Sequence, residues 1–156
     1  MEVAPALRFF EDCVAGQEWH LGPLVITVEA LDRFLEVVGE RHPIHVDRAF
    51  AHAAARHGRI VPGGMLHSYT TGAIGRQLGF AAVVAMRSFR YDFVSPLSPG
   101  EPFFVHRRIE TVALINERLG RVTERRRILD PVDHAYAIGE IDAVLLRRPT
   151  PGAEGQ

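Results

Sequence analysis

The chain has 156 residues, of which 47% are hydrophobic and 24% are charged, and its formal net charge is -1 at pH 7. This size predicts a single globular domain, and the balanced charge offers no basic excess to neutralise phosphates or attract anionic lipid, so neither nucleic acid nor a membrane is expected as a partner. No apolar run approaches the ~20 residues of a membrane span. Because Cys13 is alone and acidic residues interrupt the position of a signal peptide, we expect a cytoplasmic protein without an internal disulfide.

Two helices are predicted early in the chain. Residues 28–38 place apolar side chains at helical spacing and charged ones on the opposite face, and Thr27 is a suitable N-cap. Asp47 can cap a second, shorter helix over residues 48–56. The stretch between them is therefore expected to be a linker.

A third helix is predicted from about residue 64 to residue 78, with Gly79 placed to end it. It carries almost no charge, and a helix without a polar face is usually buried. Gly72 and Gly75 lie inside it although each costs about 1 kcal/mol against alanine, which indicates that another backbone packs close to them.

After residue 79 the hydrophobic period changes to two, which predicts half-buried strands, and short proline-rich connections favour antiparallel pairing. The strands are expected over residues 24–27, 89–93, 103–109, 122–129 and 135–145. The expected fold is α+β, with an antiparallel sheet of about five strands wrapped around the central buried helix. The single domain is expected over residues 1–148, and the composition of residues 149–156 predicts a disordered tail.

The linker, residues 39–47, reads Gly-Glu-Arg-His-Pro-Ile-His-Val-Asp and gathers four chemically active side chains. The carboxylates of Glu40 and Asp47 flank the imidazoles of His42 and His45. An imidazole with an ordinary pKa near 6.5 accepts a proton at neutral pH, and a carboxylate can orient the imidazole or a water molecule. This cluster can therefore hold and deprotonate a water.

The linker, together with the order of elements and two further segments, resembles the MaoC-like hydratases, the (R)-specific 2-enoyl-CoA hydratases of the hot-dog fold. The further segments are residues 60–66, Ile-Val-Pro-Gly-Gly-Met-Leu, and residues 95–101, Ser-Pro-Leu-Ser-Pro-Gly-Glu. The resemblance runs from about Phe9 to Arg148.

In that family the linker usually reads Gly-Asp-x-Asn-Pro-(Ile/Leu)-His-x-Asp, and its first aspartate and the histidine five residues later hold the attacking water. Pro43, His45 and Asp47 match this pattern. Glu40 stands where the aspartate is expected, and His42 replaces the asparagine.

The resemblance implies addition of water to the 2-enoyl thioester of coenzyme A or acyl carrier protein, or the reverse dehydration of a 3-hydroxyacyl thioester. This chemistry needs a base for the water, an acid for the α-carbon and donors for an enolate-like oxygen. His45 and Glu40 are the candidates for the first two roles, with His42 and Asp47 in support.

The oxygen donors are expected at the start of the third helix, where the helix dipole favours negative charge. Pro62 has no N–H group, so the candidates are the backbone amides of Gly63, Gly64 and Met65. No metal or cofactor is needed for this chemistry. The resemblance also implies that a neighbouring subunit completes the acyl tunnel, so a homodimer or larger homo-oligomer is expected.

Other interpretations stay open at this point. The glutamate form of the linker also resembles degenerate hot-dog halves, which lack the chemistry and support a catalytic partner, and a thioesterase can be built on the same fold. His45 can simply be satisfied by a backbone carbonyl, and Asp47 can be only a helix cap. The spacing of His42, His45 and Asp47 also fits metal ligands, although no second cluster completes the set. Arg125–Arg127 can contact the phosphates of coenzyme A or form a solvated strand face.

Overall fold

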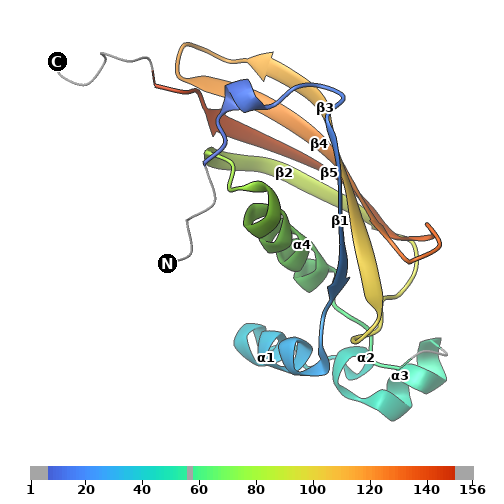
Figure 1. The fold of residues 1–156 in the computed structure, drawn as a ribbon. Coiled ribbons are helices and arrows are strands. Elements are labelled where there is room, and N and C mark those ends of the chain that lie inside the picture. The colour runs from blue at the N-terminus through green and yellow to red at the C-terminus, as the bar shows by residue number, and fades with distance from the viewer. Residues whose placement is uncertain (1–6, 56–57, 150–156) are drawn as a thin grey trace, which may run out of the picture.

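The structure, a computed structural model, describes residues 7–55 and 58–149 of the chain. Its elements form one sheet with helices on one face and at one end (Figure 1). In chain order they are η1 (Phe10–Asp12), β1 (Glu18–Val25), α1 (Val28–Val38), α2 (Pro43–Val46), α3 (Arg48–Ala55), α4 (Gly63–Leu78), β2 (Val83–Phe93), β3 (Pro102–Leu114), β4 (Leu119–Leu129) and β5 (Ala135–Leu146). Most of the expected tail, residues 150–156, lies outside the described residues.

The sheet has five strands in the order β1-β3-β4-β5-β2, and every neighbouring pair is antiparallel. β3, β4 and β5 follow one another through short turns, as predicted. The expectation that short connections join paired strands is wrong for β2 and β3, because β2 pairs with β5. Residues 94–101 make this crossing at the end of the sheet, where Leu97 is buried and its carbonyl accepts a hydrogen bond from Val61.

The helix α4 packs along the concave face of the sheet, as Figure 1 shows. Met65, Leu66 and Ile74 belong to the main core cluster, together with Phe103 and Ile128 of the sheet. This confirms the central helix of the predicted fold. The helix is buried on one side only, however, since Gly64, Ser68, Thr71 and Arg76 are exposed in the single chain.

The predicted caps explain where α1 and α3 begin. Thr27 Oγ1 accepts a hydrogen bond from Ala30 N–H at 3.2 Å, and Gly39 ends α1 with a left-handed φ of 70°. Asp47 Oδ1 accepts hydrogen bonds from Ala49 N–H at 2.8 Å and Phe50 N–H at 3.0 Å at the start of α3. Both caps are therefore confirmed.

The linker between these helices contains one short helix that the sequence analysis missed. Pro43 is the first residue of α2, where the missing N–H group costs nothing. His42 Nδ1 accepts a hydrogen bond from Ile44 N–H at 3.2 Å and so caps this turn. Proline in this linker starts a helical turn rather than preventing one.

Two further expectations need correction. The first strand begins at Glu18 rather than residue 24. Gly22 and Pro23 indicated a break, but β1 pairs with β3 on both sides of a register shift between Leu21 and Leu24. The glycines within α4 do not meet another backbone. A Cβ atom at Gly75 would meet the Phe80 ring, and one at Gly72 would meet only the Arg76 guanidinium, at 3.2 Å.

Candidate active site

His45 lies on α2 and is held by the segment that leads into α4. Its Nδ1 is 2.8 Å from the carbonyl oxygen of Ile60. A carbonyl oxygen only accepts, so Nδ1 must carry the proton of this bond, and in the neutral ring Nε2 is the basic nitrogen. Arg59 fixes the same turn, since its Nε donates to the His45 carbonyl at 2.6 Å and its guanidinium pairs with Asp32 of α1.

Glu40 follows the glycine that ends α1, and its carboxylate turns back onto the linker backbone. Its own N–H donates to Leu35 O at 3.0 Å, and its Oε1 accepts a hydrogen bond from His42 N–H at 2.7 Å. That hydrogen bond lowers the pKa of Glu40, and the Arg41 N–H and the nearby rings of His45 and His42 act in the same direction. Glu40 is therefore a carboxylate at neutral pH, close to His45 and already bonded through one oxygen.

The two supporting residues have structural partners. The ring of His42 lies edge-on to His45 and to Phe50, with centroids 6.1 Å and 6.2 Å apart. Its Nδ1 caps α2, and Asp47 Oδ1 caps α3. Among the described residues, the group whose ligand atoms lie close enough together for a metal does not include His42, His45 or Asp47.

The start of α4 provides backbone donors beside this linker. The first N–H groups of a helix have no intrahelical acceptor, and Leu66 is the first residue whose N–H reaches back, to Pro62 O at 3.0 Å. The amides of Gly63, Gly64 and Met65 precede it. A Cβ at Gly63 would meet the Phe93 ring, whereas one at Gly64 would meet nothing within 4 Å. Gly64 is thus the point where a thioester carbonyl has room to approach the amides.

A second histidine lies one turn further along α4. The His67 ring stacks on Phe89 with centroids 4.3 Å apart, and its Nδ1 is 3.4 Å from the hydroxyl oxygen of Tyr91. Burial lowers the pKa of His67, and the charge of Arg126 adds to the effect. This ring is therefore neutral at pH 7, and sequence reasoning assigned it no role.

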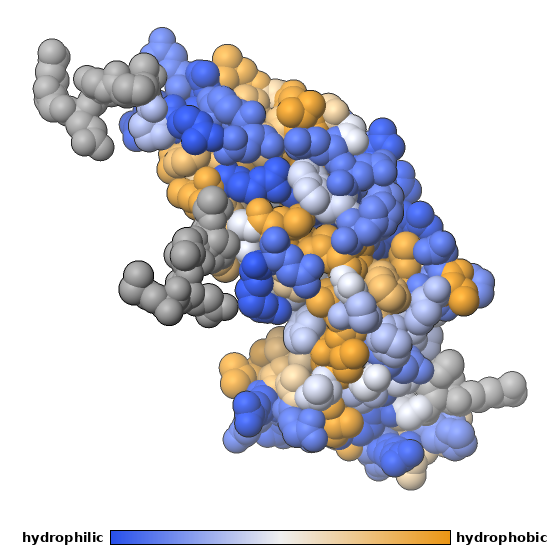
Figure 2. Space-filling model, viewed as in Figure 1, coloured by the Kyte–Doolittle hydropathy of each residue, from blue (hydrophilic) through white to orange (hydrophobic). Residues whose placement is uncertain are grey.

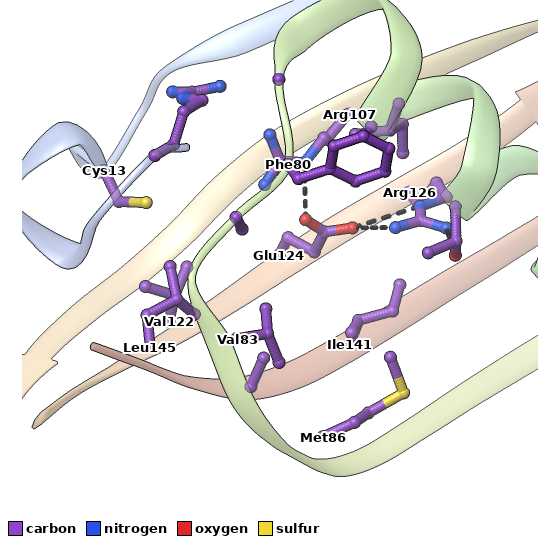
Figure 3. Close-up of a pocket in the computed structure, with 17 residues that line it drawn as sticks. Cys13, Phe80, Val83, Met86, Arg107, Val122, Glu124, Arg126, Ile141 and Leu145 are labelled. Carbon is purple, nitrogen blue, oxygen red and sulfur yellow. Dashed lines mark hydrogen bonds and ion pairs between the residues drawn. The ribbon is translucent and has the colours of Figure 1, made fainter. Parts of the chain in front are cut away.

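The structure also contains a cavity of about 190 Å³ between the second half of α4 and the sheet (Figure 3). Its walls are mostly apolar, but Arg107, Glu124 and Arg126 lie along one side. Arg107 Nε donates to Glu124 Oε2 at 2.5 Å, and Arg126 donates to Glu124 Oε1 through Nε, at 3.1 Å, and through Nη2. Sequence reasoning missed this cavity.

The two arginines decide the charge state of Glu124. Burial alone would raise the pKa of Glu124, but the guanidinium groups of Arg126 and Arg107 outweigh it and lower the pKa. Arg126 Nη1 also donates to the hydroxyls of Thr70 and Thr71 on α4, at 3.2 Å and 2.8 Å. The group therefore ties α4 to the sheet by charged hydrogen bonds.

The solvated-face interpretation of Arg125–Arg127 is wrong for its central residue. Arg126 is only 4% exposed, whereas Arg125 faces solvent. The alternation of side chains along a strand predicts that Arg126 is buried, because it lies on the same face of the sheet as the core residues Val122 and Ile128.

Within the described ranges, one group of side chains has the composition of a metal site. The ligand atoms of Glu18, His20 and His106 all lie within 4.8 Å of one another. Arg108 already donates to Glu18 Oε1 at 3.0 Å, and the two rings stack in parallel at 4.3 Å, so their nitrogens do not point at one centre. The three side chains therefore form a cluster in which Glu18 pairs with Arg108 and the two histidine rings stack on each other.

In the part of the chain that the structure describes, no helix is long and apolar enough to cross a membrane.

Comparisons with known proteins place the chain in a family. The model of a family described as "MaoC like domain" matches residues 14–126. Among proteins with curated descriptions no match is found.

Three solved structures share the fold. A monoamine oxidase regulatory protein from Archaeoglobus fulgidus has a TM-score of 0.82 at 17% identity, over 94% of this chain and 100% of that one. The (R)-hydratase from A. caviae involved in PHA biosynthesis has a TM-score of 0.70 at 22% identity, over 89% of this chain and 99% of that one. A conserved hypothetical protein from Mycobacterium tuberculosis with a double hot-dog fold has a TM-score of 0.79 at 19% identity, over 94% of this chain and 47% of that one.

At these identities the structural likeness establishes the fold alone, which is the hot-dog fold. The family match rests on the sequence itself and spans most of its length. The chain belongs to the MaoC-like domain family.

Proposed function

We propose that the chain is a hydratase or dehydratase that acts on a 2-enoyl, or 3-hydroxyacyl, thioester of coenzyme A or acyl carrier protein. The observation that carries this proposal is the fixed ring of His45. The Ile60 carbonyl holds its Nδ1–H and leaves Nε2 as the base, next to an ionised Glu40. Family membership and the (R)-hydratase fold support the same class of reaction.

In the proposed reaction, the carboxylate of Glu40 orients a water molecule and His45 Nε2 takes its proton. The water oxygen bonds to the β-carbon of the enoyl group, and the electrons of the double bond move onto the thioester carbonyl oxygen. The amides at Gly63, Gly64 and Met65 stabilise that oxygen while its negative charge develops. The protonated His45 then returns a proton to the α-carbon, so the water is added without net gain or loss of charge.

The test is the rate of hydration of crotonyl-CoA, followed by loss of its absorbance. We expect His45→Ala to lower the rate about 10²- to 10⁴-fold, the range typical of a lost acid–base group. His42→Ala is the matched control, because it removes a neighbouring imidazole whose Nδ1 is already used as a cap, and it should have a much smaller effect. A folded His45→Ala protein with an undiminished rate would exclude His45 as the base.

We further propose that residues 1–148 form one domain that acts as a homodimer, joined edge to edge through its sheets. The strand β2 supports this, since it is an edge strand of 11 residues with exposed apolar side chains. These are Val83, Val84, Met86, Phe89 and Phe93. An uncovered edge of this kind is a template for pairing with another chain.

A non-catalytic subunit is the second candidate. The observation that favours it is the hydrogen bond from His42 N–H to the Glu40 carboxylate, because it gives Glu40 a structural reason to be present. A protein of this kind would bind an acyl thioester without turnover. The crotonyl-CoA assay on the purified wild type separates the two candidates, and release of free thiol in the same assay would identify a thioesterase.

A further inference from the structure

The cavity under α4 contains more positive charge than its protein partners neutralise. Three arginines, Arg8, Arg107 and Arg126, line it, and Glu124 is the carboxylate among its lining residues. Arg126 is well satisfied, by Glu124 and by two threonine hydroxyls. The other two have fewer partners, since Arg8 Nη2 donates to the Asp12 carbonyl oxygen at 3.2 Å and the Arg107 side chain makes one hydrogen bond, to Glu124.

Arg107 is the clearest case. Its side chain is 9% exposed, and its Nε donates to Glu124. Among the described residues neither of its Nη groups has a protein acceptor, and neither is a fully buried atom without a partner, so both remain accessible to a ligand. Its central carbon lies 4.8 Å from the ring centroid of Trp19, as does that of Arg8. The cavity therefore has unused donors that match a carboxylate.

The rest of the cavity suits a hydrocarbon chain. Its apolar walls come from α4 and from the sheet, and Figure 3 shows Val83, Val122 and Ile141 among the side chains that line it. They include Ile74, Val83, Met86, Val122, Ile141 and Leu145. An apolar pocket with a few convergent charged donors at one side is typical of a site for an amphiphilic ligand.

A row of small residues on one side of α4 runs from the proposed oxyanion amides to the cavity. Gly64, Ser68, Thr71 and Gly75 follow one another at helical spacing, and Thr71 and Gly75 line the cavity. At Gly64 the space beside the helix is open, whereas at Gly75 the Phe80 ring fills it and closes the far end. From Gly64 to Thr71 the helix rises about 10 Å. An extended hydrocarbon chain covers this length in about eight C–C bonds, because bonds of ~1.5 Å in a zigzag chain each advance less than their full length.

We infer that this cavity receives the far end of the acyl group and that it selects acyl thioesters whose chain, of about eight carbons, ends in a carboxylate. This inference rests on the proposed function and names its substrate class. The terminal carboxylate accepts hydrogen bonds from the Nη groups of Arg107, with Arg8 adding positive charge, while the apolar walls hold the methylene chain.

Trp19 makes the test direct, because it is the single tryptophan of the chain and contacts both arginines. Its fluorescence is titrated with suberyl-CoA and with octanoyl-CoA, which have equal chain length and differ in the terminal carboxylate. Both are saturated, so no hydration takes place. We expect wild type to bind suberyl-CoA at least about 10-fold more tightly, in line with one charge-assisted interaction.

Arg107→Met should abolish this preference, and Arg8→Met should reduce it about threefold. Arg108→Met is the matched control, since Arg108 is the next residue on β3 but is exposed, and it should keep the preference. If Arg107→Met does not fold, the wild-type comparison and Arg8→Met still decide the question.

Equal or tighter binding of octanoyl-CoA by wild type would overturn the inference, as would an undiminished preference in Arg107→Met. Free suberate that binds as tightly as suberyl-CoA would also overturn it, by revealing an anion site unconnected to the thioester. A preference for suberyl-CoA in a protein that does not hydrate 2-enoyl-CoA would refute only the hydratase proposal. Hydration without the preference would refute only the inference, and a protein that neither binds these thioesters nor hydrates 2-enoyl-CoA would refute both.

Discussion

Replacing Glu124 by glutamine should destabilise the fold strongly while hardly changing its shape. The substitution keeps the size of the side chain and removes the negative charge between Arg107 and Arg126, which are 8% and 4% exposed. Removing one partner of a buried ion pair typically costs about 3 to 5 kcal/mol, because the remaining charge stays buried without compensation. Here two guanidinium groups lose the same carboxylate.

That loss is large for a single domain. Folded domains are stable by roughly 5 to 15 kcal/mol, and for a chain of this size each kcal/mol corresponds to roughly 2 to 4 °C in Tm. We therefore expect Glu124→Gln to melt roughly 6 to 20 °C below wild type. Urea unfolding at pH 7 measures the free-energy difference directly, and an unchanged m-value would show that the same surface is exposed on unfolding.

The pH dependence gives a second, independent check. The pKa of Glu124 is lowered in the folded state from 4.5, so the stabilisation by its charge is complete above that value and is lost as the pH falls through the folded pKa. The difference between wild type and variant should thus be the same at pH 7 and pH 5.5 and should shrink only in more acidic solution.

Glu140→Gln is the matched control, because Glu140 is an exposed residue of the neighbouring strand β5. Its stability should stay within about 0.5 kcal/mol of wild type, as is usual for surface changes. A Glu124→Gln protein as stable as the control would show that the two buried guanidinium groups do not depend on the Glu124 charge, which would contradict this prediction.

Three further outcomes test the site and the assembly. In a working hydratase, Glu40→Asp should slow the reaction about 10²-fold, since shortening the side chain misplaces the carboxylate by about 1 Å, and Glu40→Gln should slow it further. In a passive subunit the wild type is inactive, and Glu40→Asp can only restore activity. Equal rates in all three proteins would exclude Glu40 from the mechanism. Gly64→Pro removes one amide donor and should cost about 3 to 4 kcal/mol of transition-state stabilisation, with Tm measured beside the rate, and a surviving rate would show that this N–H is not a donor. Light scattering at micromolar concentration should give a dimer mass, and a fully active monomer would contradict the proposed assembly.

Local signals in the sequence were sufficient for most of the fold. The caps at Thr27 and Asp47 and the change of hydrophobic period predicted α1, α3, α4 and the strands after them. The partner of β2 could not be predicted, because it depends on where residues 94–101 cross the sheet rather than on the length of the connection. The start of β1 was hidden by Gly22 and Pro23, which read as a break although pairing continues on both sides.

For the candidate site, the sequence predicted which residues gather but not what they bond. The linker pattern singled out Glu40 and His45, and the carbonyl partner of His45 matches one of the interpretations left open. That the Glu40 carboxylate turns to the His42 N–H depends on side-chain torsion angles, which no spacing encodes. The buried position of Arg126 was available from strand parity, but three consecutive arginines suggested a solvated surface.

The proposed catalytic and oxyanion groups all lie between residues 40 and 65, and four of the five strands follow that stretch in the chain. On the proposed function, the sheet serves as a platform and the chemistry is carried by one contiguous segment, which is held to the core by the buried side chains of Val61 and Met65. Substitutions or short insertions in this segment can create, alter or abolish an activity without disturbing strand pairing. Active and inactive descendants can thus diverge from one ancestor by changes within a single short stretch of the gene, and an engineer can exchange that stretch as one unit.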